Sequence, residues 1–423
     1  MKDYVHLLKH TDIIGLGLLL LFLLNPFSLN IYIGYVLVLY FIAVRTKSLA
    51  IEFDATALVL LVFSVVYTLF EYQLYPLKNK QFLIIQTAFP MFFYLFGKRL
   101  LTSKHSQKQA LLLLLLLGLT YSLSAVATIL ADLQKGGFAQ VNRDFKYIWD
   151  GTRILATGLA GFLIYNITFP SLILSKNKLI NPLERAVLAG VYLLTIICSF
   201  RLGSRTLIAL TVMALLFAVL YQIIVLQGKE KFRFVGALLV LGFVVVNFVE
   251  IDLKADYFST LGSRLSEGTS SNESAGGRTQ LWSHAFEKMF EFPLGWISNE
   301  YAHNMWLDTA KDAGTLAFFF LVIFTVIAIK NTLRVLRVGQ IDISLKLTLA
   351  LFTLMSLIYF FVEPILKGNP YMFFFFCLLT GLLKKTLELY GVPAQEQQHR
   401  RRGANAAGPA QGLPKRAPET QRN

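Results

Sequence analysis

Long apolar segments recur along this chain from residue 12 to residue 385, and they constrain its fold more than any other feature. About 20 apolar residues cross a bilayer as a helix, and a chain in lipid can form only helices or closed barrels. The runs at 110–117 and 373–379 are continuous, without the apolar-polar alternation of barrel strands. Charged residues make up 15% of the chain, below the roughly 25% of soluble proteins. The sequence therefore predicts an all-α polytopic membrane protein.

Apolar windows predict about twelve spans. These cover residues 12–26, 28–45, 56–73, 81–97, 107–132, 152–174, 184–200, 204–226, 233–250, 315–330, 345–363 and 369–385. An even number of spans puts both termini on one side. The loops on that side carry the excess of Lys and Arg, so the positive-inside rule predicts that the termini are cytoplasmic.

The spans divide the chain into four parts. Residues 1–250 would hold nine spans joined by short loops, and 251–314 a small helical insert on the outer side. Residues 315–385 would hold the last three spans. The remainder, 386–423, is expected to be a disordered basic cytoplasmic tail because it is rich in Arg, Ala, Pro and Gly.

The net charge of +15 could indicate a nucleic-acid partner, but in a membrane protein it more often reflects basic cytoplasmic loops. We therefore expect no nucleic-acid partner. Basic residues on the outer side run against this bias, and an anionic partner would explain them. The alternative is that they pair with nearby acidic residues. The basic residues concerned form three clusters: Lys135, Arg143, Lys146 and Arg153; Arg201 and Arg205; and Arg264, Arg278, Lys288 and Lys311.

Arg278 opens a helical pattern in the insert. The segment 266–277 before it is rich in Ser and Gly and is expected to be a mobile lid. Over 278–290 the pattern places Leu281, Trp282, Ala285 and Met289 on one face. Free N–H groups and the helix dipole at such a start favour an anion, which Arg278 would bind in bidentate fashion. The alternative is a surface arginine that follows a flexible turn.

Arg201 and Arg205 lie four residues apart, between the seventh and eighth predicted spans. On a continuous helix they would share a face. The intervening Leu202-Gly203-Ser204 favours a tight helix-to-helix turn, which would direct both side chains into one crevice. The alternative is that both extend to lipid headgroups.

His303 is the main candidate for acid-base chemistry. A second helix is expected over 301–312, which would place His303 on one stripe with Leu307 and Ala310. Histidine titrates near neutral pH, so His303 suits the role of general base toward a sugar hydroxyl. The alternative is a histidine packed in the core.

Glu363 lies at the outer end of the eleventh predicted span. A carboxylate at this depth is a candidate functional group, although it could instead pair with an outer arginine.

No cofactor or metal site is expected. The two cysteines, Cys198 and Cys377, both lie in apolar stretches and form no CxxC pair. The chain also has no Walker A sequence, GxSxG, HExxH or Rossmann glycine pattern.

Taken together, these motifs resemble those of the bacterial O-antigen ligase family, within the superfamily of O-antigen polymerases and pilin oligosaccharyltransferases. Three segments carry the resemblance. They are 200–207 with Arg205 at the family position, 276–282 with Arg278 followed by Pro293 and Gly295, and His303-Asn304 followed by Leu307, Asp308, Asp312 and Gly314. Glu363 would take the place of an acid between the last two spans, and Arg143 and Arg153 match the family less closely.

The resemblance implies a membrane glycosyltransferase with a layout similar to GT-C enzymes. It would transfer a glycan from undecaprenyl diphosphate, the donor lipid, to lipid A–core, without a metal and with inversion. His303, Arg278 and Arg205 would be catalytic. Substrate would also be bound by Arg201, Arg153, Arg143, Asn304 and Glu363. The enzyme would lie in the bacterial inner membrane among membrane lipids, with its site facing the periplasm.

Two alternatives stay open at this point. An O-antigen polymerase or another lipid-linked oligosaccharyltransferase would use the same donor with a different acceptor. A transporter of lipid-linked sugars would form no bond. Transporters tend to have related halves and charged groups near the midplane, whereas here the halves look unlike and the ionisable groups collect at one face.

Overall fold

A computed structural model describes residues 2–74, 80–138, 143–175, 179–248, 255–263, 278–298 and 300–391 of the protein. These residues are mostly α-helical, with connecting loops, short 3-10 turns and one small hairpin, so the predicted all-α class is confirmed. The predicted lid, 266–277, lies outside the described residues.

The elements follow one another along the chain. They are α1 (Lys2–His10), α2 (Ile13–Leu24), η1 (Pro26–Ser28), α3 (Asn30–Glu52), α4 (Ala55–Leu74), α5 (Lys80–Leu100), α6 (Gln107–Gly136), β1 (Asp144–Lys146), β2 (Arg153–Leu155), α7 (Ala156–Leu163), η2 (Asn166–Thr168), α8 (Pro170–Ile173), α9 (Pro182–Leu202), α10 (Arg205–Val225), α11 (Gly228–Phe248), η3 (Asp256–Phe258), α13 (Arg278–Glu291), α14 (Met305–Arg337), α15 (Ile343–Val362), α16 (Ile365–Gly368) and α17 (Pro370–Tyr390).

Several helices are suited to cross a membrane. Among the described residues, six are long and apolar enough: α4, α6, α9, α10, α14 and α15. The pair formed by α7 and the segment 166–173 meets the same criterion but is bent by 44°. The chain is therefore a membrane protein. A helix covers at least part of each of the twelve predicted ranges, but crossing by the remaining helices stays a prediction.

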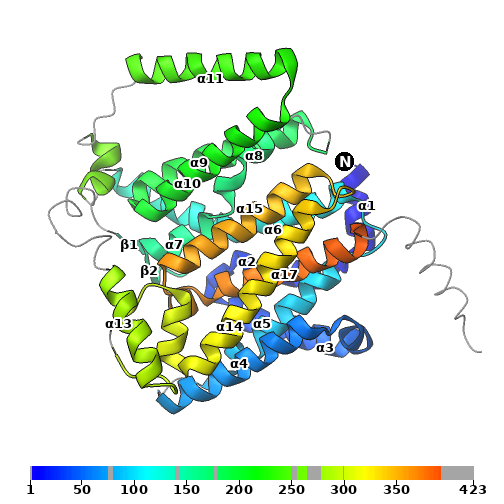
Figure 1. Cartoon of the computed structure of the whole chain (residues 1–423), viewed down its shortest axis with the longest axis vertical. Helices are drawn as coiled ribbons and strands as arrows, with labels where there is room; N and C mark the ends of the chain where they lie inside the picture. Colours follow the sequence, from blue (N-terminus) through cyan, green and yellow to red (C-terminus); the bar gives the residue numbers. More distant parts are fainter. Residues whose placement is uncertain are drawn as a thin grey trace, which may run out of the picture.

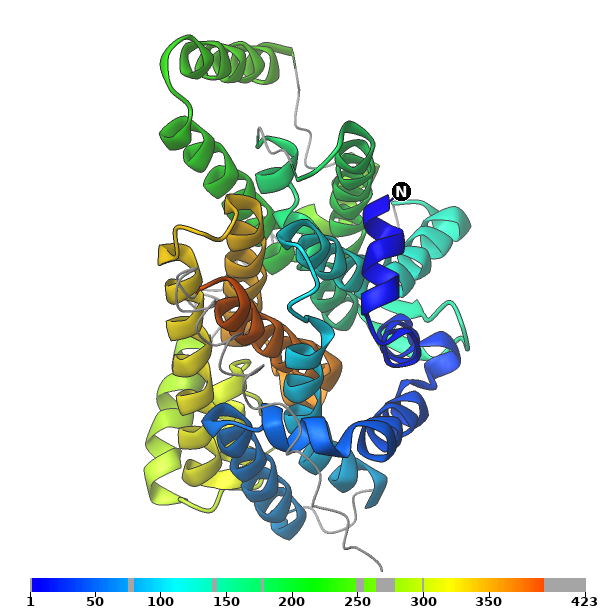
Figure 2. The same cartoon turned by 90° about the vertical axis from the view of Figure 1, so that its right-hand side faces the viewer.

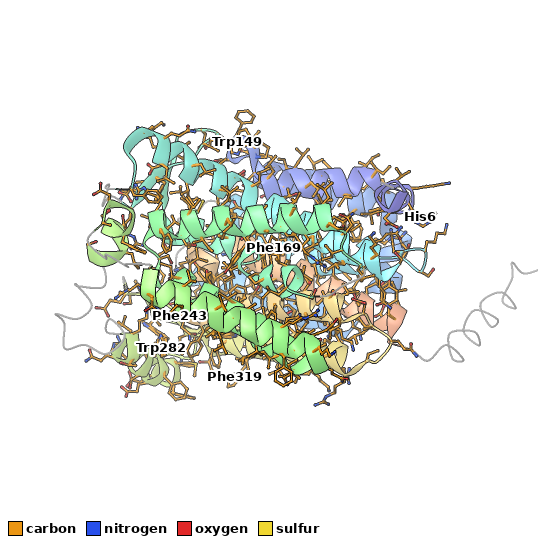
Figure 3. All side chains as sticks on the ribbon, turned by 90° about the horizontal axis from the view of Figure 1, so that it is seen from above. His6, Trp149, Phe169, Phe243, Trp282 and Phe319 are labelled. Carbon is orange, nitrogen blue, oxygen red and sulfur yellow. The ribbon has the colours of Figure 1, made fainter. Side chains whose placement is uncertain are left out.

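The bundle has two distinct ends (Figure 1). The N terminus and α1 lie at one end, and the hairpin and α13 lie at the other. His6 and Trp282 mark these opposite ends in Figure 3. The end of α17 and the helix α1 both contact the start of α6. The Tyr390 hydroxyl of α17 donates to the His105 carbonyl at 2.8 Å, and the Gln109 amide of α6 contacts His6 of α1. The two ends of the described chain thus lie together, while α11 stands apart from the other helices (Figure 2).

Two glycines allow α5 and α17 to cross closely. Gly97 of α5 faces the carbonyl oxygen of Leu378, and Gly381 of α17 faces the carbonyl oxygen of Tyr94. A Cβ atom at either glycine would collide with the main chain of the opposite helix. Small residues serve this purpose at helix interfaces in membranes, where close main-chain approach increases van der Waals contact.

Three sequence predictions about local structure are wrong. The helix expected over 301–312 begins only at Met305, as the first residue of α14. At Gly314 a φ of 80° interrupts α14, and the freed Thr315 N–H donates to the Pro293 carbonyl. A hairpin opens the predicted span 152–174, and the expected tail from 386 is still helical as far as Tyr390.

We expect Gly381→Ala to destabilise the protein, because the added methyl group has no space against the Tyr94 carbonyl. Overpacking of this kind costs about 1–3 kcal/mol. The control is Gly190→Ala on α9, where nothing lies within 4 Å of the new methyl group. That change should be neutral or stabilising by up to about 1 kcal/mol, because alanine favours helix. Thermal unfolding in detergent measures both, and equal midpoints for the two variants would contradict the close crossing.

Candidate active site

A pocket of about 470 Å³ lies at the end of the bundle that holds the hairpin, and its mostly apolar wall includes several polar and charged side chains. Its wall combines η1, the hairpin, α7, the end of α15 and the turn into α17. Three residues predicted from the sequence line it, namely Arg153, His303 and Glu363. The fold therefore brings together groups that lie up to 210 positions apart in the chain, and this pocket is the candidate active site.

His303 lies in the turn before α14 and not on a helical stripe, which corrects the sequence prediction. Its φ is 52°, in the left-handed region that a residue with a side chain rarely adopts. The imidazole is half-buried, and its Nδ1 atom is buried without a hydrogen-bond partner among the described residues. The backbone conformation is therefore unusual at the position expected to carry acid-base chemistry.

The surroundings of His303 favour a neutral imidazole. Burial lowers its pKa below the ordinary 6.5, and the nearby positive charge of Arg278 lowers it further. Both causes disfavour the imidazolium form. At neutral pH His303 can therefore accept a proton.

Asn304 begins α14 as its N-cap. Its Oδ1 atom accepts from the N–H groups of Trp306 and Leu307 at 3.1 and 3.2 Å, and its Nδ2 atom donates to the Phe361 carbonyl at 3.3 Å. Both polar atoms of the amide are thus engaged in holding the helix start. Its predicted contact with a substrate stays a prediction.

Arg278 and Glu363 meet beside His303. Arg278 is the first residue of α13, as predicted, and Glu363 caps the end of α15. One guanidinium nitrogen lies 3.7 Å from Glu363 Oε1, which is a loose ion pair. The pairing expected as the alternative role for Glu363 is therefore present. Because the Arg278 side chain is 27% exposed, its guanidinium also keeps access to solvent at the site.

Arg201 and Arg205 are separated by the predicted turn. Gly203, with a φ of 56°, ends α9, and the Ser204 side chain caps α10. This break puts the two arginines on different helices, so they do not share a helical face. Arg201 is buried and Arg205 is exposed, and neither lines the described pocket.

Arg201 is held in a buried ion pair. Its Nε and one terminal nitrogen bond the same Asp132 oxygen at 2.8 and 2.7 Å, and the guanidinium lies 4.8 Å from the Phe145 ring centre. These contacts join α9 to the end of α6 and to β1. Arg201 thus supports the hairpin that forms part of the pocket wall.

Arg143 lies directly before the first strand of the hairpin, and Arg153 begins the second strand. Arg153 on β2 pairs with Asp144 on β1 at 2.6 Å and also lines the pocket. Pairing with a local acid, the alternative considered for the outer arginines, is thus observed for Arg153. Arg143 precedes β1, and its carbonyl accepts from the Ala156 N–H at the start of α7.

Sequence reasoning missed several pocket residues. Tyr359 lies one helical turn before Glu363 on α15, and its hydroxyl donates to the Thr157 carbonyl at 2.6 Å. The spacing of four could have indicated it. Asn369 precedes Pro370 at the start of α17, and its buried Oδ1 atom has no hydrogen-bond partner within the described structure. The described residues contain no group of three His, Cys, Asp or Glu placed to hold a metal ion.

We expect Asp132→Ala to destabilise the protein by roughly 3 kcal/mol, because it leaves the buried Arg201 charge uncompensated. Asp144→Ala removes the partner of Arg153, whose side chain is 74% exposed, and should cost less than about 1 kcal/mol. Unfolding in detergent measures the two variants side by side. Similar losses would show that the two ion pairs do not differ as their burial indicates.

Comparison with known proteins adds no assignment: no family model matches the chain, and a search of curated proteins finds no match.

Proposed function

We propose that the protein is an O-antigen ligase-type glycosyltransferase of the bacterial inner membrane. It would transfer a glycan from undecaprenyl diphosphate to a sugar of lipid A–core at the periplasmic face. The observation that carries the proposal is His303, a half-buried histidine with a lowered pKa that lines the pocket beside Arg278 and Glu363. A neutral base next to a cation suits transfer from an anionic leaving group.

The proposed reaction is a single displacement. The acceptor hydroxyl oxygen forms a bond to the anomeric carbon of the donor sugar while the bond from that carbon to the diphosphate oxygen breaks. The hydroxyl proton passes to His303, and the lipid diphosphate leaves with the bonding electron pair. One displacement inverts the anomeric centre.

Arginine would stabilise the negative charge that develops on the diphosphate. A charge-assisted hydrogen bond contributes about 1.5–3 kcal/mol. Arg278 is supported by its ion pair with Glu363, which lines the pocket, and by its partly exposed side chain. Arg205 enters the proposal through the resemblance alone, because it does not line the described pocket. Arg153 would contact substrate from β2, where it lines the pocket wall.

The membrane topology is part of the same proposal. About twelve spans in a GT-C-like layout would put both termini in the cytoplasm and the segment 251–314 on the periplasmic side. The position of α1 and the end of α17 opposite the pocket supports this topology. Both substrates are lipid-linked, so each would reach the pocket from within the bilayer.

The direct test uses purified full-length protein in detergent, given lipid A–core and glycan-loaded undecaprenyl diphosphate, with and without EDTA. We expect glycan on lipid A–core in both conditions. His303→Ala should lower the rate about 100- to 10,000-fold, the usual contribution of a general base. Arg278→Ala should lower it about 10- to 100-fold, as the loss of one charge-assisted bond implies.

His284→Ala and Lys288→Ala are matched controls, because both lie on α13 and outside the pocket lining. Their rates should equal that of the unmodified protein. Glycan lengthening on undecaprenyl diphosphate would instead indicate a polymerase. The absence of any new bond with either acceptor would reject glycosyl transfer and favour a transporter.

The pH dependence follows from the state of His303. The neutral imidazole is the active form, so the rate should rise with pH through the pKa of His303 and then level off. Because burial and Arg278 lower this pKa, the midpoint should lie below 6.5. Arg278→Gln should move the midpoint upward in the residual activity. A midpoint above 6.5 in the unmodified protein would contradict the assigned environment.

A further inference from the structure

We propose that Asp308 is a positioning residue that holds His303 in its left-handed conformation and thereby directs the imidazole at the pocket. The catalytic part of this inference rests on the proposed function. The geometric part rests on the turn 300–304, which directly precedes α14.

The Asp308 carboxylate accepts hydrogen bonds from main-chain N–H groups on both sides of His303. Its Oδ1 atom accepts the Ala302 N–H at 2.8 Å, and its Oδ2 atom accepts the Asn304 N–H at 3.1 Å. The side chain is buried, at 6% exposure, so water does not compete well for these bonds. A carboxylate suits this task because it presents two acceptor oxygens, whereas an amide presents one.

The conformation that these bonds hold is strained. A residue with a side chain pays a free-energy cost at positive φ, and it stays there only where its surroundings demand it. The Asn304 N–H bond to Asp308 holds the peptide unit after His303, and the Ala302 carbonyl, bonded by Trp282 Nε1, holds the unit before it. The Ala302 N–H bond to Asp308 fixes the next unit back, between residues 301 and 302, so the main chain is held on both sides of His303. The imidazole then faces the pocket beside Glu363.

Two further side chains hold the same turn. Trp282 of α13 donates from Nε1 to the Ala302 carbonyl at 2.7 Å, and Lys311 of α14 donates from Nζ to the Glu300 carbonyl at 2.8 Å. These bonds fix where the turn lies between α13 and α14. Of the three side chains, Asp308 is the one that bonds on both sides of His303.

Helix capping alone does not account for Asp308. In a capping box the third helical residue returns a bond to the N-cap N–H. Asp308 is the fourth helical residue after Asn304, and it also reaches Ala302, two residues before the cap. Asn304 already caps α14. The bond to Ala302 therefore serves the turn that contains His303.

The test separates positioning from general stability by observing His303 directly. The protein contains six histidines, so ¹⁵N-histidine labelling with NMR in detergent follows each imidazole, and His303→Asn assigns the signal. The variants are Asp308→Asn, which keeps one acceptor oxygen, and Asp308→Ala, which keeps none. The matched control is Thr309→Val, an isosteric change at the next buried position of α14.

We expect the His303 titration midpoint to rise toward 6.5 in Asp308→Ala, because the released imidazole leaves its half-buried position near Arg278. Loss of the Asp308 charge alone would instead lower the midpoint. The rise should be smaller in Asp308→Asn and absent in Thr309→Val. In the transfer assay, kcat should fall on the order of 100-fold for Asp308→Ala and about tenfold for Asp308→Asn, with KM little changed, since misplacement of a catalytic group affects the chemical step.

An unchanged His303 signal in both Asp308 variants, or an equal change in Thr309→Val, would overturn the positioning role. If the unmodified protein transfers no glycan while the His303 midpoint still shifts in the Asp308 variants, the positioning stands and the proposed function fails. If the protein transfers glycan and kcat is unaffected in Asp308→Asn despite the NMR shift, the turn geometry does not limit the reaction and the catalytic part fails.

Discussion

Main-chain N–H and C=O groups in a bilayer must find partners within the protein, and this constraint decides where the chain can depart from a helix. The described structure departs from it in three notable places: the bend between α7 and α8, the interruption at Gly314, and the turn around His303. At Gly314 and at the His303 turn, the freed groups are bonded by neighbouring elements, as the Thr315–Pro293 and Ala302–Asp308 bonds show. At both places the irregular main chain is satisfied by bonds within the protein.

Burial gives different roles to arginines that look alike in the sequence. Arg201 is almost fully enclosed and bonded twice to Asp132, so its charge supports the hairpin. Arg153 pairs with Asp144 in the open, where solvent screens the interaction. Arg278 lies between these cases: its pair with Glu363 is loose, and its charge acts on His303. An arginine so placed can respond to an incoming anion.

The chemistry proposed for the pocket depends on keeping His303 neutral and fixed. Burial and Arg278 supply the first condition, and the turn bonded by Asp308 supplies the second. The two conditions are separable, because one is electrostatic and the other is a matter of main-chain geometry. Substitutions at Arg278 and Asp308 therefore probe different properties of the same imidazole.

The sequence by itself determined the helical membrane class, the start of the helix at Arg278 and the tight turn at Gly203. Each depends on local information: apolar runs, a preceding pair of glycines, and a residue that tolerates positive φ. Tertiary structure alone decided that Arg201 is buried against Asp132, that His303 lies outside α14, and that Tyr359 and Asn369 share its pocket. These facts depend on contacts between segments distant in the chain, because a helical pattern cannot show which partner a neighbouring helix will present. The helix predicted at 301–312 was shortened for the same reason: Asp308 turns back to bond the chain before Asn304.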